Sequence, residues 1–296
     1  MRFFIEYYVV KTFLLLTRLL PNRAVYALCK GLARVLFQLD KRRRFLTLKN
    51  LRLAFPEKSD EILVDIAQKA YESVAITLAE TLLMYNDKLD IDSLIVNKEE
   101  IEAKFNHYFK DESRGKLLLT GHFCNWELLA QFLGKSGYPI KNIARKGNNR
   151  LIDERITQAF RGKYGNKNIP KKNAIISLVK TLKAGLRVSI LFDQKAGNTN
   201  SVETSFFGQP VRTIDVIAQL KLKYNPLILP TFIVRLEDGK YNVIMLEPID
   251  YMAEEEDDTL IKHTLMTQRY NDMLEGMIRA YPEQWFWMHD RWRIAK

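Results

Sequence analysis

Hydrophobic and polar positions divide the chain into two parts with different periodicities. Up to about residue 88 the apolar residues recur at helical spacing, as in the segment that Ser59 caps, where Ile62, Ile66, Ala70 and Val74 fall on one face. From residue 116 onward, short apolar runs alternate with helical stretches. We expect strands at residues 116–120, 140–144, 187–192, 227–234 and 241–246, and helices at 126–133, 151–164, 174–184, 214–224 and 259–279. This alternation predicts an α/β fold with a mixed, largely parallel sheet flanked by helices.

The first helix is unusually apolar. Residues 3–20 read FFIEYYVVKTFLLLTRLL, in which Glu6, Lys11 and Arg18 interrupt bulky and aromatic side chains. Charges at these places disfavour a clean membrane span, and no small-residue cleavage site follows, as a secretory signal would need. We therefore expect a retained helix that lies in, or dips through, the membrane interface, the alternative being an ordinary buried helix. The predicted organisation is a membrane-anchoring helix at residues 1–22 and one domain at 23–296, helical to about residue 90 and α/β from about 116.

Charge narrows the class of partner. The chain has 46 Lys and Arg against 35 Asp and Glu, a net charge of +11, which suits nucleic acid, an anionic membrane surface or an acidic substrate. The basic run at residues 40–44 is interpreted either as a solvated turn or as a contact for lipid phosphates or an acidic carrier protein. The Trp- and Arg-rich stretch at 281–293 suits a stacking surface for nucleic acid, a membrane-interface belt or core packing, and the pattern favours packing.

The stretch at residues 121–127, GHFCNWE, carries the strongest signal for chemistry. It follows a predicted strand directly, so Gly121 permits a sharp exit and Asn125 can cap the next helix. Glu127 then falls in the first helical turn, and His122 in the preceding turn can fold back towards it. A carboxylate that orients an imidazole makes a general base.

Three interpretations of this stretch stay open from the residues alone. His122 could be a general base for a hydroxyl nucleophile, a metal ligand together with Cys124 and Glu127, or a structural histidine bonded to backbone. The metal interpretation is weaker, because no other histidine has ligand-like spacing, and a Cys124 nucleophile beside His122 is weaker still. The glycines form neither a P-loop nor a dinucleotide fingerprint, so no cofactor is expected.

A second polar cluster follows the strand at 187–192. Asp193 and Gln194 come directly after it, and ligands of open α/β sheets bind beyond the carboxyl ends of the strands. We therefore expect this cluster to converge with His122 on one site. Among the basic residues between the two clusters, Arg145 and Arg161 are candidates for binding phosphate or stabilising an oxyanion.

Several segments in their order along the chain resemble the late acyltransferases of lipid A biosynthesis. The segments that carry the resemblance are LP at 20–21, NLRLAFP at 50–56, GHFCNWE at 121–127, DQ at 193–194, FFG at 206–208 and PEQWFWMH at 282–289. Two departures are Cys124, where the family usually has a small residue such as glycine, and the Arg145-Lys146-Gly147 segment, which replaces an aromatic-Arg-Pro segment.

The resemblance implies an enzyme at the cytoplasmic face of the bacterial inner membrane. It implies an acyl carrier protein thioester as donor, an anionic lipid A precursor as acceptor, and neither a metal nor nucleic acid. His122 would be the catalytic base and Glu127 its paired acid, while Asn125, Arg145, Arg161, Asp193 and Gln194 would bind substrate. Alternatives are an acyltransferase for another glycolipid or aminolipid, such as a phosphatidylinositol mannoside, a hydrolase that releases free fatty acid, and a non-catalytic basic protein that binds lipid at the membrane.

Overall fold

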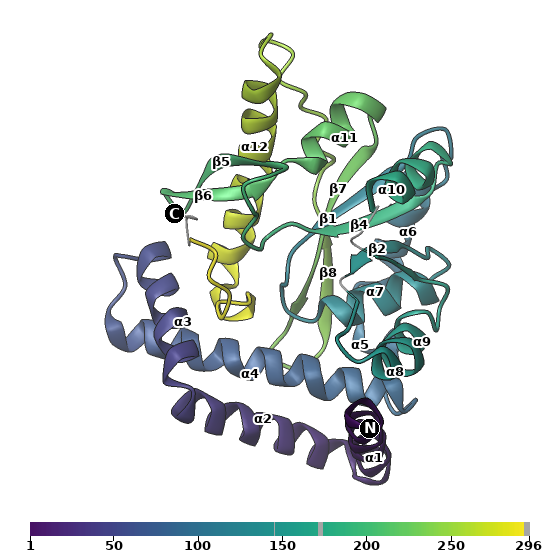
Figure 1. The fold of residues 1–296 in the computed structure, drawn as a ribbon, viewed down its shortest axis with the longest axis vertical. Helices are drawn as coiled ribbons and strands as arrows, with labels where there is room; N and C mark the ends of the chain where they lie inside the picture. Colours follow the sequence, from purple (N-terminus) through teal and green to yellow (C-terminus); the bar gives the residue numbers. More distant parts are fainter. Residues whose placement is uncertain (145, 171–173, 293–296) are drawn as a thin grey trace.

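A computed structural model describes residues 1–144, 146–170 and 174–292 of the chain. Its centre is a six-stranded sheet in the order β3-β2-β4-β1-β7-β8 (Figure 1). The strands are β1 (Lys116–Thr120), β2 (Lys141–Ala144), β3 (Lys167–Pro170), β4 (Arg187–Leu191), β7 (Leu227–Arg235) and β8 (Tyr241–Met245). Among the described strands of this sheet, only the β7–β8 pair is antiparallel, which confirms the predicted mixed, largely parallel arrangement.

The apolar run at residues 116–120 forms a central strand of the sheet. Every residue of β1 is buried, as expected for a central parallel strand that is covered on both faces. β1 lies between β4 and β7, and Thr120 at its end is the register partner of Leu191 at the end of β4. The chain therefore leaves both strands at the same edge of the sheet, and this edge carries the candidate site.

Helices after residue 116 cover the sheet. They are α7 (Trp126–Lys135), α8 (Arg150–Ile152), α9 (Gln158–Arg161), α10 (Ala174–Lys183), α11 (Val216–Tyr224) and α12 (Thr259–Ala280). The helix expected at 151–164 is interrupted by a π-helical turn at Asp153–Thr157 and ends at Arg161. A separate hairpin of β5 (Ser201–Phe206) and β6 (Gln209–Ile214), which the periodicity did not predict, packs on α12.

The part of the chain before the sheet is helical. Its elements are α1 (Arg2–Leu19), α2 (Asn22–Leu39), α3 (Lys41–Ala54), α4 (Asp60–Tyr85), α5 (Ile91–Leu94) and α6 (Lys98–Phe109). Figure 1 shows α2 and α4 side by side along one edge of the molecule, with α1 at one end of the pair. The basic run at 40–44 is not a turn: Asp40 accepts a hydrogen bond from the backbone N–H of Arg43 and so caps α3, which makes the run its first turn.

α1 and α2 leave many large apolar side chains exposed to solvent. On α2, Val25, Cys29 and Phe37 pack into the core, while other apolar side chains of the same helix remain exposed. The exposed set on the two helices is Phe3, Phe4, Ile5, Tyr8, Val9, Phe13, Leu15, Leu16, Leu19, Leu28, Leu32, Val35, Leu36 and Leu39. Within the described ranges, no helix is both long enough and apolar enough to cross a bilayer.

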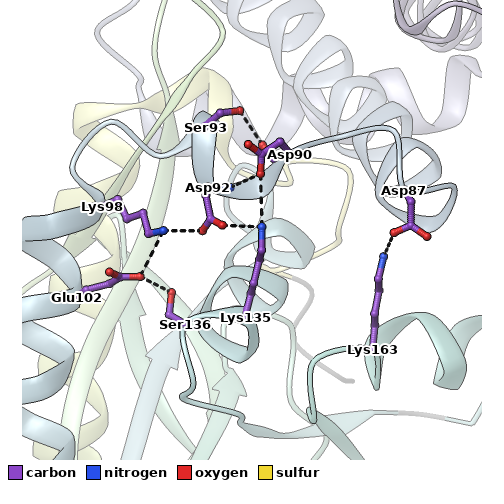
Figure 2. Close-up of polar contacts among 9 residues, drawn as sticks. All are labelled: Asp87, Asp90, Asp92, Ser93, Lys98, Glu102, Lys135, Ser136 and Lys163. Atoms are coloured by element: carbon purple, nitrogen blue, oxygen red, sulfur yellow. Dashed lines mark hydrogen bonds and ion pairs between the residues drawn. The ribbon is translucent and has the colours of Figure 1, made fainter.

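Ion pairs fix the far end of α7. Lys135 in its last turn contacts the carboxylates of Asp92, at 2.6 Å, and Asp90, at 3.4 Å (Figure 2). Lys98 of α6 bridges Asp92 and Glu102, whose carboxylate also accepts a hydrogen bond from the hydroxyl of Ser136. These groups are partly exposed, so each pair contributes little stability alone, and together they link the end of α7 to α5 and α6.

Candidate active site

The parallel register of β1 and β4 brings His122 and Asp193 together. Each lies two residues beyond the register pair Thr120 and Leu191, at the carboxyl edge of the sheet. The carboxylate of Asp193 accepts hydrogen bonds from the His122 backbone N–H, at 2.8 Å, and from the imidazole Nδ1, at 2.9 Å. The two polar clusters therefore converge in the structure, as expected.

A glycine is needed for this approach. An added Cβ on Gly121 would lie 3.1–3.2 Å from the Asp193 side chain, which is closer than carbon atoms normally pack. Asp193 is 2% exposed, and its second oxygen also accepts a hydrogen bond from the indole N–H of Trp285, at 2.9 Å. A carboxylate so enclosed has little freedom to move, so it fixes the orientation of the imidazole.

The hydrogen bonding of His122 determines which of its ring nitrogens is basic. Asp193 is an acceptor, so Nδ1 carries the hydrogen and Nε2 keeps its lone pair. Among the described residues, the partner of Nε2 is the side-chain amide of Gln194, at 3.4 Å. The ring packs edge-on against Trp126, and its side chain remains 23% exposed. The imidazole is thus held in one orientation, and its side chain is still partly open to solvent.

Charges around the imidazole make it a stronger base. Burial alone lowers the pKa of His122, but the negative charge and hydrogen bond of Asp193 outweigh it and place this pKa above its ordinary value of 6.5. Glu127 adds to this increase, and Arg161 opposes it. Burial in turn raises the pKa of Asp193, yet the His122 imidazole and the hydrogen bonds hold it below its ordinary value.

The expected pairing of His122 with Glu127 differs from the structure. Among the described residues the two share no hydrogen bond, and the Glu127 carboxylate instead forms a two-pronged ion pair with the Arg161 guanidinium, in which Arg161 Nε lies 3.1 Å from the carboxylate. The reason is geometric: Nδ1 points towards the end of β4, whereas Glu127 sits in the first turn of α7 and faces α9. Glu127 thus acts on His122 through charge, and Asp193 takes the orienting position.

The other predicted site residues fall into three groups. Asn125 caps α7, with its side-chain oxygen accepting from the Leu128 backbone N–H at 2.9 Å, and it is completely buried. Gln194 lies over the imidazole, and Arg161 faces Glu127 beside it. Arg145 lies outside the described residues.

The geometry also bears on the alternatives for Cys124. Burial raises the pKa of its thiol to about 12, so it is protonated at neutral pH and is a poor nucleophile. Its backbone φ of 48° is in the left-handed region, which is strained for a residue other than glycine. Over the described ranges, no three His, Cys, Asp or Glu side chains gather in a way that could hold a metal ion.

The C-terminal aromatic stretch forms the wall behind the site. Trp285, Trp287 and Trp292 are buried, which confirms packing over the nucleic-acid and membrane-belt interpretations of this stretch. The backbone N–H of Phe286 donates to the His122 carbonyl at 3.1 Å, and Trp285 pairs with Phe123 as an isolated antiparallel bridge. Trp285 was not predicted to contact the site, although its position in a dense aromatic run after the last helix was a signal for a packing role.

Comparison with known proteins shows the family of the chain. A sequence profile described as bacterial lipid A biosynthesis acyltransferase matches residues 1–294. The chain belongs to this family. The family's lipid A biosynthesis lauroyltransferase of Escherichia coli is 28% identical over 279 residues, which cover 93% of this chain and 87% of the relative. The family's acyltransferase of Haemophilus influenzae and the palmitoleoyltransferase of Escherichia coli are each 26% identical, covering 86% of this chain and 79% of the relative.

The predicted resemblance to the acyltransferases of lipid A biosynthesis is therefore confirmed. With its family and its relatives, this chain is an acyltransferase of lipid A biosynthesis.

Proposed function

We propose that this enzyme transfers a fatty acyl chain from an acyl carrier protein thioester to a hydroxyl of a lipid A precursor, with His122 as general base. The observation that carries the proposal is the hydrogen bond from His122 Nδ1 to the buried Asp193 carboxylate, which leaves Nε2 as the basic nitrogen of a partly exposed side chain. Acyl transfer to an alcohol needs a base of this kind, because a neutral hydroxyl is a weak nucleophile.

The proposed reaction begins with proton transfer. Nε2 of His122 takes the proton from the acceptor hydroxyl as its oxygen attacks the thioester carbonyl, and the Asp193 carboxylate stabilises the imidazolium that forms. The tetrahedral intermediate then collapses, the carbon–sulfur bond breaks, and the imidazolium returns its proton to the departing thiolate. The products are an ester on the acceptor and the free thiol of the carrier.

Arg161 is proposed to stabilise the negative oxygen of the intermediate. Its guanidinium is held by Glu127 and is close enough to His122 to act on the imidazole's pKa, and the Arg161 side chain is 32% exposed. A cation that is oriented before the reaction need not reorganise as charge develops, which is the source of its catalytic value. We propose that Gln194 positions the acceptor over the imidazole, and that the backbone N–H groups at the start of α7, beyond Asn125, assist Arg161.

Charge and apolar surface support membrane-bound, anionic substrates. The net charge of +11 favours both an acidic carrier protein and a phosphorylated glycolipid. α1 and α2 expose many large apolar side chains, and exposed apolar patches mark sites of interaction with proteins or membranes. We propose that residues 1–22 anchor the protein on the cytoplasmic face of the inner membrane, ahead of an acyltransferase domain at 23–296.

One helical stretch connects this apolar surface with the site. α1 packs against α8, where the side chain of Asn149 donates to the Phe3 carbonyl and to Glu6, both at 2.9 Å. The same helical stretch continues into α9 and Arg161. A lipid acceptor that enters from the bilayer beside α1 would thus meet the proposed catalytic residues without leaving the interface.

The test is acyl transfer with defined substrates. Purified enzyme is incubated with acyl carrier proteins of several chain lengths and a panel of acceptors, including a lipid A precursor, a phosphatidylinositol mannoside and an aminolipid, and products are identified by mass spectrometry. We expect ester formation on the lipid A precursor. Ester on another lipid, or release of free fatty acid without any acylated acceptor, would contradict the proposed acceptor or the proposed transfer.

A further inference from the structure

Glu80 is a completely buried carboxylate near the C-terminal end of α4, in a mostly apolar stretch. It accepts hydrogen bonds from three parts of the chain: the Tyr26 hydroxyl of α2 at 3.0 Å, the Tyr241 hydroxyl of β8, and the Asn125 side-chain amide at 2.6 Å. Burying a carboxylate is costly unless it is well bonded, so these donors must be in place for the fold to retain it.

The Asn125 bond links Glu80 to the proposed catalytic turn. The two ends of the Asn125 amide have different partners, because its oxygen caps α7 at Leu128 while its nitrogen donates to Glu80. Glu80 therefore determines which way the amide faces. If the Asn125 amide were flipped, its NH₂ group would face the Leu128 N–H and could not accept its hydrogen bond. The helix that carries Glu127 would then lose its cap.

The turn itself needs outside support. Cys124, between His122 and Asn125, holds a φ of 48°, and such strain persists only where surrounding contacts impose it. One turn of α4 supplies such contacts, since the hydroxyl of Thr77 donates to the Cys124 carbonyl at 3.0 Å and Glu80 binds the next residue. On the other side, the Cys124 N–H donates to the Gln284 carbonyl at 2.6 Å.

We infer that Glu80 is a positioning residue for the acyl transfer reaction: acting through Asn125, it holds the turn in which His122 meets Asp193. Glu80 touches neither His122 nor Asp193 among the described contacts, so its effect on the reaction is indirect. Burial raises the pKa of the Glu80 carboxyl, while its three hydrogen-bond donors oppose the increase. Its role rests on the proposed function of His122, so the test below includes a measurement that does not require turnover.

The decisive variants change the direction of the Glu80–Asn125 bond. In Asn125→Asp the new carboxylate can still cap α7, but its other oxygen faces the Glu80 carboxylate and cannot donate a hydrogen bond to it. We therefore expect kcat to fall by about tenfold or more with little change in KM. In the double variant Glu80→Gln with Asn125→Asp, the glutamine amide donates to the new carboxylate. We expect this variant to recover kcat to within about threefold of the wild-type enzyme.

Two single variants separate positioning from folding. Glu80→Gln keeps an oxygen for Asn125 and Tyr241 and lets Tyr26 accept from its amide, so kcat should stay within about threefold of wild type. Tyr26→Phe is the matched control, since it removes a hydrogen bond from the same carboxylate but leaves the Asn125 bond in place, and kcat should change by about twofold at most. Both are assayed well below their melting temperatures.

The measurement that does not require turnover is an NMR pH titration of the imidazoles, of which the chain has four. The pKa of His122 should be lower in Asn125→Asp than in wild type and return in the double variant, because loss of the Asp193 contact removes the cause of its increase. Equal kcat and equal imidazole titration in Asn125→Asp and wild type would overturn the inference, as would failure of Glu80→Gln to improve the Asn125→Asp enzyme. Absence of acyl transfer by the wild-type enzyme would instead contradict the proposed function, and the titration would still test the positioning of His122.

Discussion

Replacing Asp193 by Asn should remove the base while leaving the fold in place. The carboxylate accepts from the His122 N–H, from Nδ1 and from Trp285 Nε1. An asparagine oxygen at the Oδ2 position keeps the first and third of these bonds, and its NH₂ group then faces Nδ1. Because NH₂ only donates, Nδ1 must become the acceptor, and the hydrogen moves to Nε2, where the substrate proton should go. The other amide orientation would oppose two N–H donors and is less favourable.

The size of the expected rate loss follows from the loss of the Nδ1–H tautomer of His122. We expect kcat to fall by roughly 10³–10⁴, which corresponds to about 4–5.5 kcal/mol of transition-state stabilisation, with KM changed little. The assay is initial-rate acyl transfer at saturating acceptor, with the melting temperature measured in parallel. A kcat within tenfold of wild type, in a protein of unchanged melting temperature, would refute the assignment of Asp193 as the orienting carboxylate.

A second buried histidine–carboxylate pair provides the matched control. Asp215 is 6% exposed and lies 3.1 Å from Nδ1 of His263, and it accepts a hydrogen bond from Gln219. Asp215→Asn makes the same chemical change in a pair that does not contact His122. We expect it to leave kcat within about twofold of wild type, whatever it does to stability.

Three further predictions concern the charges and the apolar surface. The base acts when neutral, and the pKa of His122 is raised, so kcat/KM should rise with pH and reach half its plateau above pH 6.5 in a pH–rate profile. Arg161→Ala should lower kcat by about 10² through loss of oxyanion stabilisation, and it should move this half-point to higher pH because a nearby positive charge is removed. Replacing Phe4, Ile5 and Val9 together by Ser should weaken binding to anionic vesicles by about two orders of magnitude in a sedimentation assay, since each side chain is more than half exposed and contributes about 1 kcal/mol when buried in lipid.

Controls for these measurements come from the same molecule. Glu127→Gln should shift the half-point in the direction opposite to Arg161→Ala, because it removes a negative charge near the imidazole. Replacing Leu260 and Ile261, which are exposed on α12, by Ser should leave vesicle binding unchanged. A half-point below pH 6.5, or equal vesicle binding by the α1 variant and wild type, would contradict the corresponding account.

The sheet and the location of the site could be predicted from sequence because they depend on local patterns. The apolar runs that became β1 and β4 end in polar residues, and the rule for parallel strands then places His122 and Asp193 at one edge. The basic run at the start of α3 was harder to assign, since a capping Asp40 followed by a first turn of Lys and Arg looks like a solvated loop.

The partner of His122 could not be predicted from local patterns, because the direction of a side chain depends on contacts with distant parts of the chain. Glu127 is the nearest carboxylate in sequence, yet the turn at Cys124 is held by Thr77 and Gln284 in an orientation that directs the imidazole to Asp193. The role of Glu80 was not predicted for a related reason: its hydrogen bonds are to residues that lie far apart in the chain. Its only local signal was a lone carboxylate within the apolar stretch of α4.

The central claim is that the imidazole of His122 activates the acceptor hydroxyl. The most direct test compares acyl transfer by the wild-type enzyme and His122→Ala, from an acyl carrier protein thioester to a lipid A precursor, with the acylated product quantified by mass spectrometry. Loss of a general base predicts a rate lower by roughly 10²–10⁴ in a variant that still folds. Transfer at close to the wild-type rate by His122→Ala would show that the proton is taken elsewhere.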